Sequence, residues 1–597
     1  MNPNCSGRKS RRNSVISASP TSSQPRAVSV TAILLLALAV HGPLLLMQLP
    51  ATSYDAYTHM FFASHYATHW FNPWNEKWFA GFSQTTYPPL AHQLIALFSW
   101  VFGLTTSYMF VQLVAILLLA IGVLRYAQLW VDEQSASYAA VGSIFLGSLA
   151  ILTYQAGQIN TILGAAITLN AVPYFYRWLR NGTFSNFIKS SLLTVCAAAV
   201  HHLTLITIVL FATPVIWLAI VDRDTEGSEA SVGGIISRAV GFGALVGVGI
   251  AVVLLPFWIS FFKNPVTQLP IPHPSRDNYL LNLKTALNFW IIPYGALMAV
   301  VPFMFWFGTR SRRLMPLFFG WWVTTLIGLG GTTPFAKLLF GRFYYIFTYE
   351  RFTFLSTIMA LPVAGLLAAM LINKYGRKAM VPLFIATVLT GAFGVAWLTF
   401  NPIFDTPFKT TPIVQFLNRD DHSKFRYLTL GFGSLFSKVS IETKAGSVDG
   451  DYNSARLLPE MTQYGAGKLD NAKYYGLAGM ESLRAMLKHA NQYGLKYIFV
   501  RDRYYEPLLA FAGWRQVETY DDGGVELWVK DDVPPAQNMD FGAPPPAWEG
   551  LMWGLLPMTV AVLSLLSVIM LPERRVVGET IPFPAATEDE PVLREAK

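Results

Sequence analysis

The sequence predicts a polytopic α-helical membrane protein of about twelve transmembrane helices with one small α/β domain outside the membrane. Of its 597 residues, 53% are hydrophobic and only 13% are charged, whereas about 25% are charged in an ordinary soluble domain. The charge is also uneven: long stretches carry none, while residues 404–547 carry Lys, Arg, Asp and Glu at the frequency of a soluble protein. A membrane body and one soluble domain follow from this contrast.

The placement of charge argues against nucleic-acid binding, and the small number of cysteines excludes a disulfide framework or a cysteine-based metal site. A formal net charge of +9 is compatible with nucleic-acid binding, but the basic residues stand in short clusters between apolar stretches, where they orient a membrane protein. We therefore expect no nucleic-acid partner. The two cysteines, Cys5 and Cys196, cannot build a disulfide framework or a cysteine-based metal site.

Both ends of the chain are predicted to be cytoplasmic tails. Residues 1–27 are basic and rich in Ser, and we expect them to be disordered. The apolar run after them is about as long as a membrane crossing, longer than the apolar region of a cleaved signal, so we expect it to be a retained first span. Residues 572–597 form the second tail after a last helix at 549–571.

Twelve crossings are predicted from apolar stretches of about 20 residues, the length that a hydrocarbon core of about 30 Å requires. They lie near residues 28–48, 107–127, 136–153, 160–178, 189–201, 203–221, 239–262, 286–307, 314–330, 350–372, 379–400 and 549–571.

The orientation follows from the excess of Lys and Arg in short cytoplasmic loops. With twelve crossings every basic cluster falls on one side; the clusters are Arg8, Lys9, Arg11 and Arg12; Arg177, Arg180 and Lys189; Arg310, Arg312 and Arg313; Lys374, Arg377 and Lys378; and Arg574 and Arg575. The stretch 189–221 is either one long helix or two short ones. One helix would place two clusters outside, so we expect a break at His201-His202-Leu203-Thr204. The protein is then a multi-pass protein of the cell membrane with both termini in the cytoplasm.

Function is expected in the segments that this orientation places outside. These are the first outer loop at 49–106, the loops at 263–285 and 331–349, and the soluble domain at 401–548. Residues 28–400 form the membrane body to which the outer segments are attached.

The first outer loop places candidate residues close to the membrane surface. Asp55 and His59 lie on one face if the segment is helical, and such a pair can hold a proton or share a metal ion; alternatively, Asp55 is a helix end or part of a surface ion pair. Three tryptophans, Trp70, Trp74 and Trp78, recur every four residues and predict a helix in the membrane interface. After Pro88 and Pro89, residues 90–103 predict a second surface helix.

Further candidates for substrate binding come from the same outer face. Arg351 begins a predicted span, and its planar guanidinium suits a lipid phosphate, unless it forms a structural ion pair with Glu350 or Asp55. Arg342 approaches the same span, and Glu76, Lys77 and Tyr87 of the first outer loop are further candidates. His201, His202, His273 and Arg276 are weaker candidates, because paired histidines within a membrane are more often structural.

The outer domain has an alternating pattern of strands and helices. Residues 425–432 and 496–500 predict strands with a helix at 481–493 between them, and 504–513 predicts a short helix. A hairpin is expected around Asp521-Asp522-Gly523-Gly524. Residues 464–468 contain glycines and a lysine but lack the spacing of a phosphate loop, so we assign no nucleotide to them.

Taken in order along the chain, these motifs resemble the GT-C superfamily of glycosyltransferases, which use polyprenyl-phosphate sugars and include protein O-mannosyltransferases and the aminoarabinose transferases of lipid A. The resemblance rests on the acidic residue just outside the first span, the aromatic loop with two surface helices, and Tyr87-Pro88-Pro89-Leu90. Asp55-Ala56-Tyr57-Thr58-His59 and the stretch from Gly513 to Lys530 are most similar to prokaryotic membrane proteins catalogued as 6-pyruvoyl-tetrahydropterin synthase-related. The name of that group is not evidence of pterin chemistry.

The resemblance implies a membrane glycosyltransferase that transfers a sugar from a polyprenyl-phosphate donor to a glycan, lipid or protein outside the membrane. It implies that Asp55 activates the acceptor or holds a divalent metal ion, the one cofactor to be considered. The Trp-Trp-Asp signature of oligosaccharyltransferases is absent, because Trp321-Trp322 is followed by Val323. A lipid or solute transporter and a non-catalytic membrane assembly protein remain the alternatives, although the two halves of the chain show no repeat of the kind common in transporters.

Overall fold

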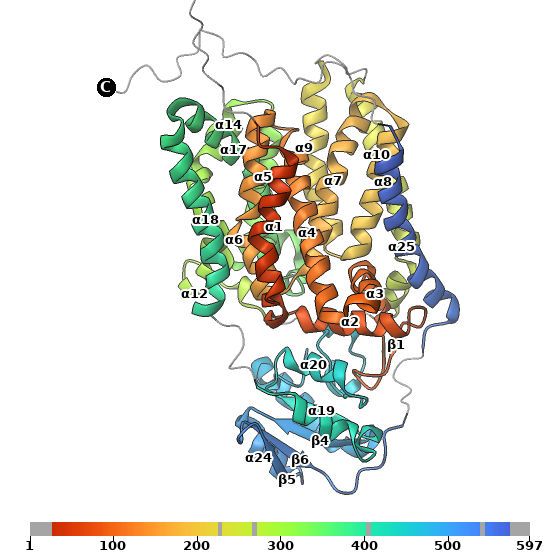
Figure 1. Ribbon diagram of the computed structural model, residues 1–597. Coiled ribbons are helices and arrows are strands. Elements are labelled where there is room, and N and C mark those ends of the chain that lie inside the picture. The colour runs from red at the N-terminus through yellow and green to blue at the C-terminus, as the bar shows by residue number, and fades with distance from the viewer. Residues whose placement is uncertain (1–26, 225–229, 265–271, 402–407, 538–543, 573–597) are drawn as a thin grey trace, which may run out of the picture.

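The computed structural model describes residues 27–224, 230–264, 272–401, 408–537 and 544–572. It consists of a bundle of apolar helices with a small sheet domain at one end (Figure 1). The predicted tails, except for residue 27 and residue 572, and the basic clusters at 8–12 and 574–575 lie outside the described residues.

Each of the twelve predicted crossings coincides with helical structure. The helices are α1 (Val30–Leu46), α4 (Leu104–Ala127), α5 (Glu133–Ile144) continued by α6 (Gly147–Ala150) and a π-helix (Ile151–Ala156), α7 (Ile159–Asn181), α8 (Phe184–Val200), α9 (Thr204–Val221), α10 (Val232–Val253), α12 (Leu283–Ala286) to α14 (Val301–Arg310), α15 (Met315–Gly328), α17 (Glu350–Tyr375), α18 (Arg377–Phe400) and α25 (Ala547–Met570).

Eight helices within the described residues are long and apolar enough to cross a membrane. The apolar helices α1, α8 and α15 are shorter than a full crossing, and α7 is not among the eight. The protein is thus a multi-pass membrane protein, and the count of twelve crossings stays a prediction. The limits predicted for the seventh crossing, 239–262, were wrong. Helix α10 ends at Val253, and a separate helix, α11 (Leu255–Lys263), follows it. Pro256 lies in the first turn of α11, where the missing proline N–H is tolerated.

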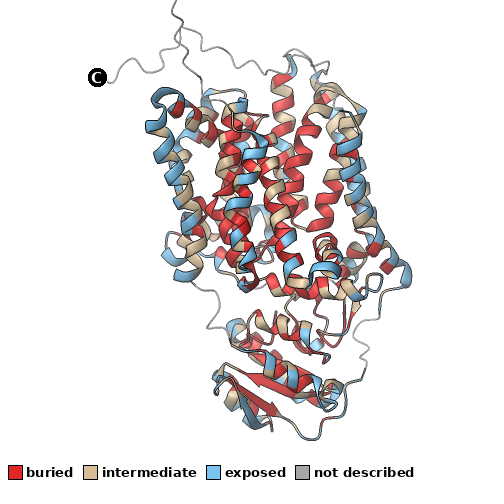
Figure 2. Ribbon diagram, in the orientation of Figure 1, coloured by how far each residue is buried: buried red, intermediate tan, exposed pale blue. Residues whose placement is uncertain are grey.

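The outer helices of the bundle present apolar side chains outward, as helices in contact with lipid do. Figure 2 shows the interior helices mostly buried, whereas α18 and α25 have few buried residues. On α18, Phe384 and Leu389 are 49% and 61% exposed. A helix with such a surface is stable in a membrane and unfavourable in water.

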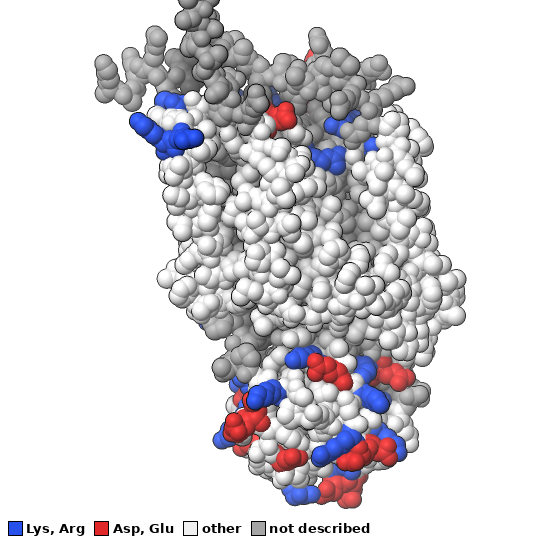
Figure 3. Space-filling view, in the orientation of Figure 1, with Lys and Arg blue, Asp and Glu red and all other residues white. Residues whose placement is uncertain are grey.

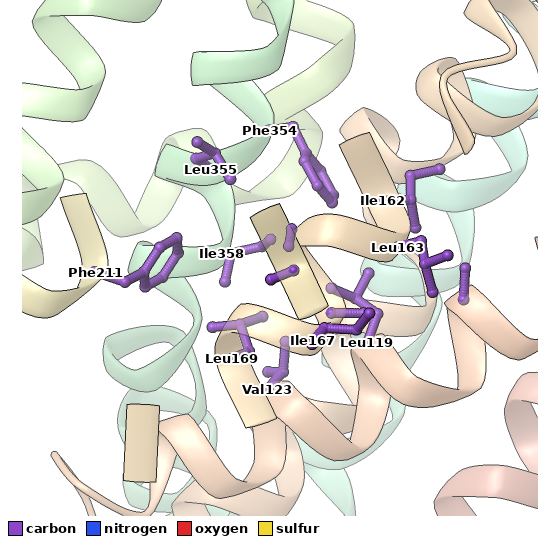
Figure 4. Close-up of a cluster of buried hydrophobic side chains, with 14 of the residues drawn as sticks. Leu119, Val123, Ile162, Leu163, Ile167, Leu169, Phe211, Phe354, Leu355 and Ile358 are labelled. Carbon is purple, nitrogen blue, oxygen red and sulfur yellow. The ribbon is translucent and has the colours of Figure 1, made fainter. Parts of the chain in front are cut away.

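The interior helices pack closely around α4, α7 and α17. Figure 4 shows Leu119 of α4, Ile167 of α7 and Ile358 of α17 within one buried cluster. At Gly365 of α17 a Cβ atom would lie 2.1 Å from the carbonyl oxygen of Ser135 in α5. Glycine at this position therefore allows the two helices to approach.

The described charges lie mainly at the two ends of the molecule. Figure 3 shows an uncharged belt over the bundle, mostly basic residues with an acidic patch at the end opposite the sheet domain, and mixed charges on the domain. This pattern agrees with a membrane protein whose sheet domain lies on the side away from the basic loops.

The predicted break in the stretch 189–221 is confirmed. α8 ends at Val200, His201 has extended backbone (φ −158°, ψ 138°), and α9 begins at Thr204. The polar residues at the middle of the stretch mark this break, and they place a turn in the chain between two short helices.

The sheet domain corresponds to the predicted soluble domain and is called the soluble domain below. It contains the four-stranded sheet β3-β4-β6-β5, formed by β3 (Arg426–Leu430), β4 (Leu495–Val500), β6 (Val525–Val529) and β5 (Arg515–Tyr520). β3 and β4 are parallel, and β4, β6 and β5 are antiparallel. The predicted strands and the hairpin around 521–524 are present. The domain helices are α19 (Thr411–Asn418), α20 (Leu435–Glu442), α21 (Pro459–Thr462), α22 (Gly476–Lys488), α23 (Ala490–Tyr493) and α24 (Glu506–Phe511).

The first outer loop contains two helices, as predicted, but the expected tryptophan stripe was wrong. Helix α2 (Ala56–Thr68) ends before Trp70, and β1 (Trp74–Asn75) and β2 (Phe82–Ser83) form a hairpin before α3 (Leu90–Phe102). Pro73 disfavours helical backbone at Asn72, so a helix could not continue through the three tryptophans. Spacing by four therefore did not place these tryptophans on one helix face.

Candidate functional site

The backbone at Asp55 is attached to the end of the π-helix. The backbone amide of Tyr54 donates to the carbonyl of Gln155 at 2.9 Å, and that of Asp55 donates to the carbonyl of Ala156 at 3.0 Å. π-Helical turns are rare and are frequent at functional sites. The residue after them, Gly157, has φ +71°, and a Cβ there would lie 3.0 Å from the Asp55 amide nitrogen. Asp55 is thus fixed against a backbone position that only glycine fits.

The side chain of Asp55 stands at the start of α2 without a strong partner. It is half-buried, caps no amide of its own helix and makes no ion pair within the described residues. Burial raises the pKa of Asp55 to about 7, an effect opposed chiefly by the charge of Arg351 and reinforced by Asp451 and Glu350. Near neutral pH this carboxylate is therefore able to accept and release a proton.

Arg351 lies in the first turn of α17, and its charge acts on Asp55. Its Nε donates to Oε1 of Gln158 at 2.8 Å, and Gln158 Nε2 donates to Glu350 Oε1 at 2.9 Å. Arg351 Nε also lies 3.8 Å from Glu350 Oε1, so the predicted ion pair with Glu350 is present. The two terminal guanidinium nitrogens form no hydrogen bond within the part of the chain that the structure describes, which leaves them for an anionic ligand.

Four histidines from three parts of the chain lie around the ring of Tyr87. Its ring lies 5.2 Å from His92, 5.6 Å from both His201 and His202, and 6.1 Å from His59. His59 and His92 are joined by a 3.0 Å hydrogen bond between Nδ1 and Nε2. The turn between α8 and α9 therefore meets the first outer loop at the site.

This histidine cluster is buried and short of polar partners. The Nδ1 atoms of His92, His201 and His202 have no hydrogen-bond partner within the described residues. Burial and the Arg351 charge lower the pKa of His59 to about 3. His59 is therefore neutral at physiological pH and adds no charge beside Arg351.

The soluble domain contributes a wall of the same site. Tyr452 lies 4.9 Å from the Tyr87 ring, and its hydroxyl donates to the carbonyl of Thr86 at 3.0 Å. Asp451 and Lys468 form a 2.7 Å ion pair with side chains only 10% and 7% exposed. The charges of both residues act on Asp55.

The first outer loop and the domain also share a core. Trp78 stacks on Phe61 of α2 at 3.6 Å between ring centroids, and its indole donates to Ser440 of α20 at 2.9 Å. The amide of Ser447 donates to the carbonyl of Lys77 at 2.8 Å. The domain is thus packed on the loop that carries Asp55.

Two solved structures are similar in fold to most of this chain. ArnT from Cupriavidus metallidurans bound to undecaprenyl phosphate has a TM-score of 0.50 and 10% identity over 85% of this chain and 100% of that chain. The arabinofuranosyltransferase AftD from Mycobacteria has a TM-score of 0.51 and 13% identity over 86% of this chain. Both are GT-C glycosyltransferases. The chain has the GT-C fold.

The similarity concerns the fold, because the identities are low. This chain spans 40% of the length of AftD. No family model matches the sequence, and no curated protein matches it. The GT-C fold was predicted correctly, whereas the similarity to the 6-pyruvoyl-tetrahydropterin synthase-related group stays a prediction.

Within this GT-C fold, six of the predicted site residues come together: Asp55, His59, Tyr87, His201, His202 and Arg351. Three others lie elsewhere. Glu76 is exposed, the Lys77 ammonium donates to the carbonyl of Thr443, and exposed Arg342 lies 5.1 Å over the Phe343 ring.

His273 and Arg276, which precede α12, make structural contacts, and Arg276 bonds the segment before α17. His273 Nδ1 bonds the Ser275 hydroxyl at 2.8 Å, and Arg276 donates to the carbonyl of Phe347 at 2.9 Å. Ser275 in turn accepts from the amide of Tyr349 at 2.9 Å. These residues support the start of α17, and so the position of Arg351.

The sequence suggested a metal ion shared by Asp55 and His59. Within the described residues no group of three His, Cys, Asp or Glu side chains is arranged to hold one, and His59 Nδ1 is bonded to His92. A metal ion at Asp55 and His59 stays a prediction.

Proposed function

We propose that this protein is a membrane glycosyltransferase that takes a sugar from a polyprenyl-phosphate donor. The observation that carries the proposal is a site where the bundle meets the soluble domain. It contains Asp55, which has no ion-pair partner among the described residues, and Arg351, whose terminal nitrogens make no hydrogen bond among them and whose charge acts on Asp55. The GT-C fold supports it, since one protein of that fold was solved with undecaprenyl phosphate bound.

The chemistry assigned to Asp55 is general-base catalysis. The carboxylate takes the proton of an acceptor hydroxyl, whose oxygen then attacks the anomeric carbon of the donor sugar. The bond between that carbon and the phosphate oxygen breaks, and polyprenyl phosphate leaves with the bonding electrons. A single displacement inverts the anomeric configuration.

Arg351 is assigned to the departing phosphate. Negative charge grows on the phosphate oxygen as the bond breaks, and a guanidinium fixed in advance stabilises it. Gln158 accepts from Nε of Arg351, and Glu350 lies close to the same nitrogen. The two terminal nitrogens make no hydrogen bond within the described residues and are left for the phosphate. The neutral imidazoles near Arg351 leave its charge available to the ligand.

The acceptor is a glycan, lipid or protein on the outer face of the cell membrane, with both chain termini in the cytoplasm. The basic end of the bundle opposite the domain supports this orientation (Figure 3). α2 and α3 lie at the end of the bundle that carries the domain (Figure 1). The site is therefore next to the membrane, and the lipid-linked donor reaches it from there.

The test is release of free polyprenyl phosphate from polyprenyl-phosphate sugars by the purified full-length chain in detergent or vesicles. Sugar transfer predicts release that depends on an acceptor, measured by mass spectrometry of the extracted lipids. A transporter or flippase would instead move lipid or solute across vesicles with the sugar–phosphate bond intact, and a non-catalytic protein would do neither.

A further inference from the structure

The soluble domain contacts α2 one turn after Asp55. Thr58 lies three residues beyond Asp55, and its hydroxyl donates to Oδ2 of Asp451 at 2.9 Å across 393 residues of sequence. The Ser437 hydroxyl donates to the same oxygen at 3.1 Å. Thr58 is only 7% exposed. The bond therefore lies inside the interface between the domain and the first outer loop.

Asp451 is held in a single orientation. Lys468 Nζ lies 2.7 Å from its other oxygen, Oδ1, and also donates to the carbonyl of Gly433 at 3.3 Å. Both carboxylate oxygens are thus used by groups of the protein. A buried carboxylate with charge-assisted and hydroxyl partners is well ordered and is costly to disturb. Its role is then to hold its partners and not to receive a substrate proton.

The start of α2 is consequently attached at two points. On the side of the membrane body, the Asp55 amide is bonded to the carbonyl of Ala156. On the side of the soluble domain, Thr58 is bonded to Asp451. Asp55 lies between these attachments, and its side chain caps no amide of α2 that would fix it. Its position depends on both.

We propose that Asp451, held by Lys468 and bonded to Thr58, is a positioning residue that fixes Asp55 at the start of α2. The soluble domain is then a working part of the site and not only a cap over it. That Asp451 influences the rate of transfer rests on the proposed function, whereas that it orders the start of α2 does not.

Thr58→Val is the decisive variant, because it removes the hydroxyl, keeps the shape and leaves the pair of Asp451 and Lys468 intact. We expect kcat to fall about ten- to hundredfold, the scale of a small misplacement of a reacting group. We expect the donor KM to stay within about twofold, because Arg351 is untouched. Amide hydrogen exchange at the first turn of α2 should become faster, and Thr58→Ser should restore both properties.

Thr68→Val is the matched control on the same helix. The Thr68 hydroxyl is exposed and bonds only the carbonyl of Ser64, the carbonyl of His65 and the neighbouring His69 ring among the described residues. This variant should keep the wild-type kcat and the wild-type exchange at the start of α2.

A double-mutant cycle with Asp451→Ala tests whether Thr58 and Asp451 act as one unit. The loss of kcat in the double variant should be no larger than in Asp451→Ala alone. If Asp451→Ala fails to fold, the kcat and the amide exchange of Thr58→Val still test the positioning role.

The outcomes separate this inference from the proposed function. Wild-type kcat in Thr58→Val, or a lowered kcat with unchanged exchange at α2, overturns the positioning role even if Asp55→Asn is inactive. Faster exchange in Thr58→Val together with full transfer by Asp55→Asn would instead refute the proposed function and leave the attachment of α2 in place.

Discussion

Gln158 holds Arg351 and Glu350 with the two ends of one amide: its Oε1 accepts from Arg351 Nε at 2.8 Å, and its Nε2 donates to Glu350 at 2.9 Å. Gln158 stands one residue after Gly157, at the N-cap of α7. The segment 155–158 therefore contacts the backbone of Asp55 and the side chain of Arg351. The two halves of the proposed site are positioned by one short stretch of chain.

Replacing Gln158 by Leu should weaken donor binding about tenfold. The variant keeps the volume but removes the acceptor for Arg351, and a hydrogen bond to a charged group contributes about 1.5–3 kcal/mol. The measurement is the donor KM in a transfer assay. An unchanged KM would show that the orientation of Arg351 does not depend on Gln158.

Replacing Arg351 by Gln should lower the affinity for polyprenyl phosphate about ten- to hundredfold, because charge-assisted hydrogen bonds to the phosphate are lost. Arg342→Gln is the matched control, since Arg342 is an exposed arginine in the segment that precedes α17. Binding is measured with a labelled polyprenyl phosphate in nanodiscs. Equal losses in the two variants would point to general membrane electrostatics.

Transfer should increase as the pH rises through about 7. Burial raises the pKa of Asp55 to about 7, and a general base must be ionised to accept a proton. Below this pH the carboxyl group is protonated and kcat falls. The pH profile of kcat tests this, and a rate that is flat between about pH 5 and pH 8 would contradict the assignment.

Gly157→Ala should reduce kcat. At φ +71° the new Cβ would lie 2.4 Å from the Ser53 hydroxyl and 3.0 Å from the Asp55 amide nitrogen, so the backbone that holds Asp55 must move. Gly513→Ala is the matched control: Gly513 has φ +80°, but a Cβ added there would have no atom within 4 Å, so this variant carries the strain of positive φ without the clash. Equal activity in the two variants would show that the close contact is not needed.

The soluble domain should gain stability from Asp449→Asn at alkaline pH. Burial raises the pKa of Asp449 to about 7 from its ordinary value of 3.8, so the folded state keeps a proton that the unfolded state releases. Stability is therefore lost as the pH rises from about 4 to about 7, and the loss stays constant above that. The difference in melting temperature between variant and wild type should be larger at about pH 8 than at about pH 4. Asp421→Asn, at an exposed carboxylate of the same domain, is the control for the loss of one negative charge.

Hydropathy and charge made much of the membrane body predictable. The break at His201 followed from the placement of basic loops, and the structure has it between Val200 and Thr204. Asp55 was found because an acidic residue just outside the first span is conspicuous, and Arg351 because a buried arginine at a helix start is costly.

The remainder of the site depends on contacts that no local pattern records. Asp451, Tyr452 and Lys468 reach α2 and Tyr87 only through the folded domain, hundreds of residues away in sequence. The π-helix that ends at Ala156 has no hydropathy signature. Trp78 was assigned to a lipid interface by its spacing, whereas it lies in the core shared by the loop and the domain.

The most direct test of the role of Asp55 is single-turnover transfer of a labelled sugar from a polyprenyl-phosphate donor by the purified full-length chain, comparing wild type with Asp55→Asn at a pH about one unit above the pKa of this carboxyl group. We predict inverted product from the wild type and a rate lower by about 10²- to 10⁴-fold in Asp55→Asn, the usual contribution of a general base, with donor binding retained. Equal rates in the two proteins would contradict the assignment of Asp55 as the base.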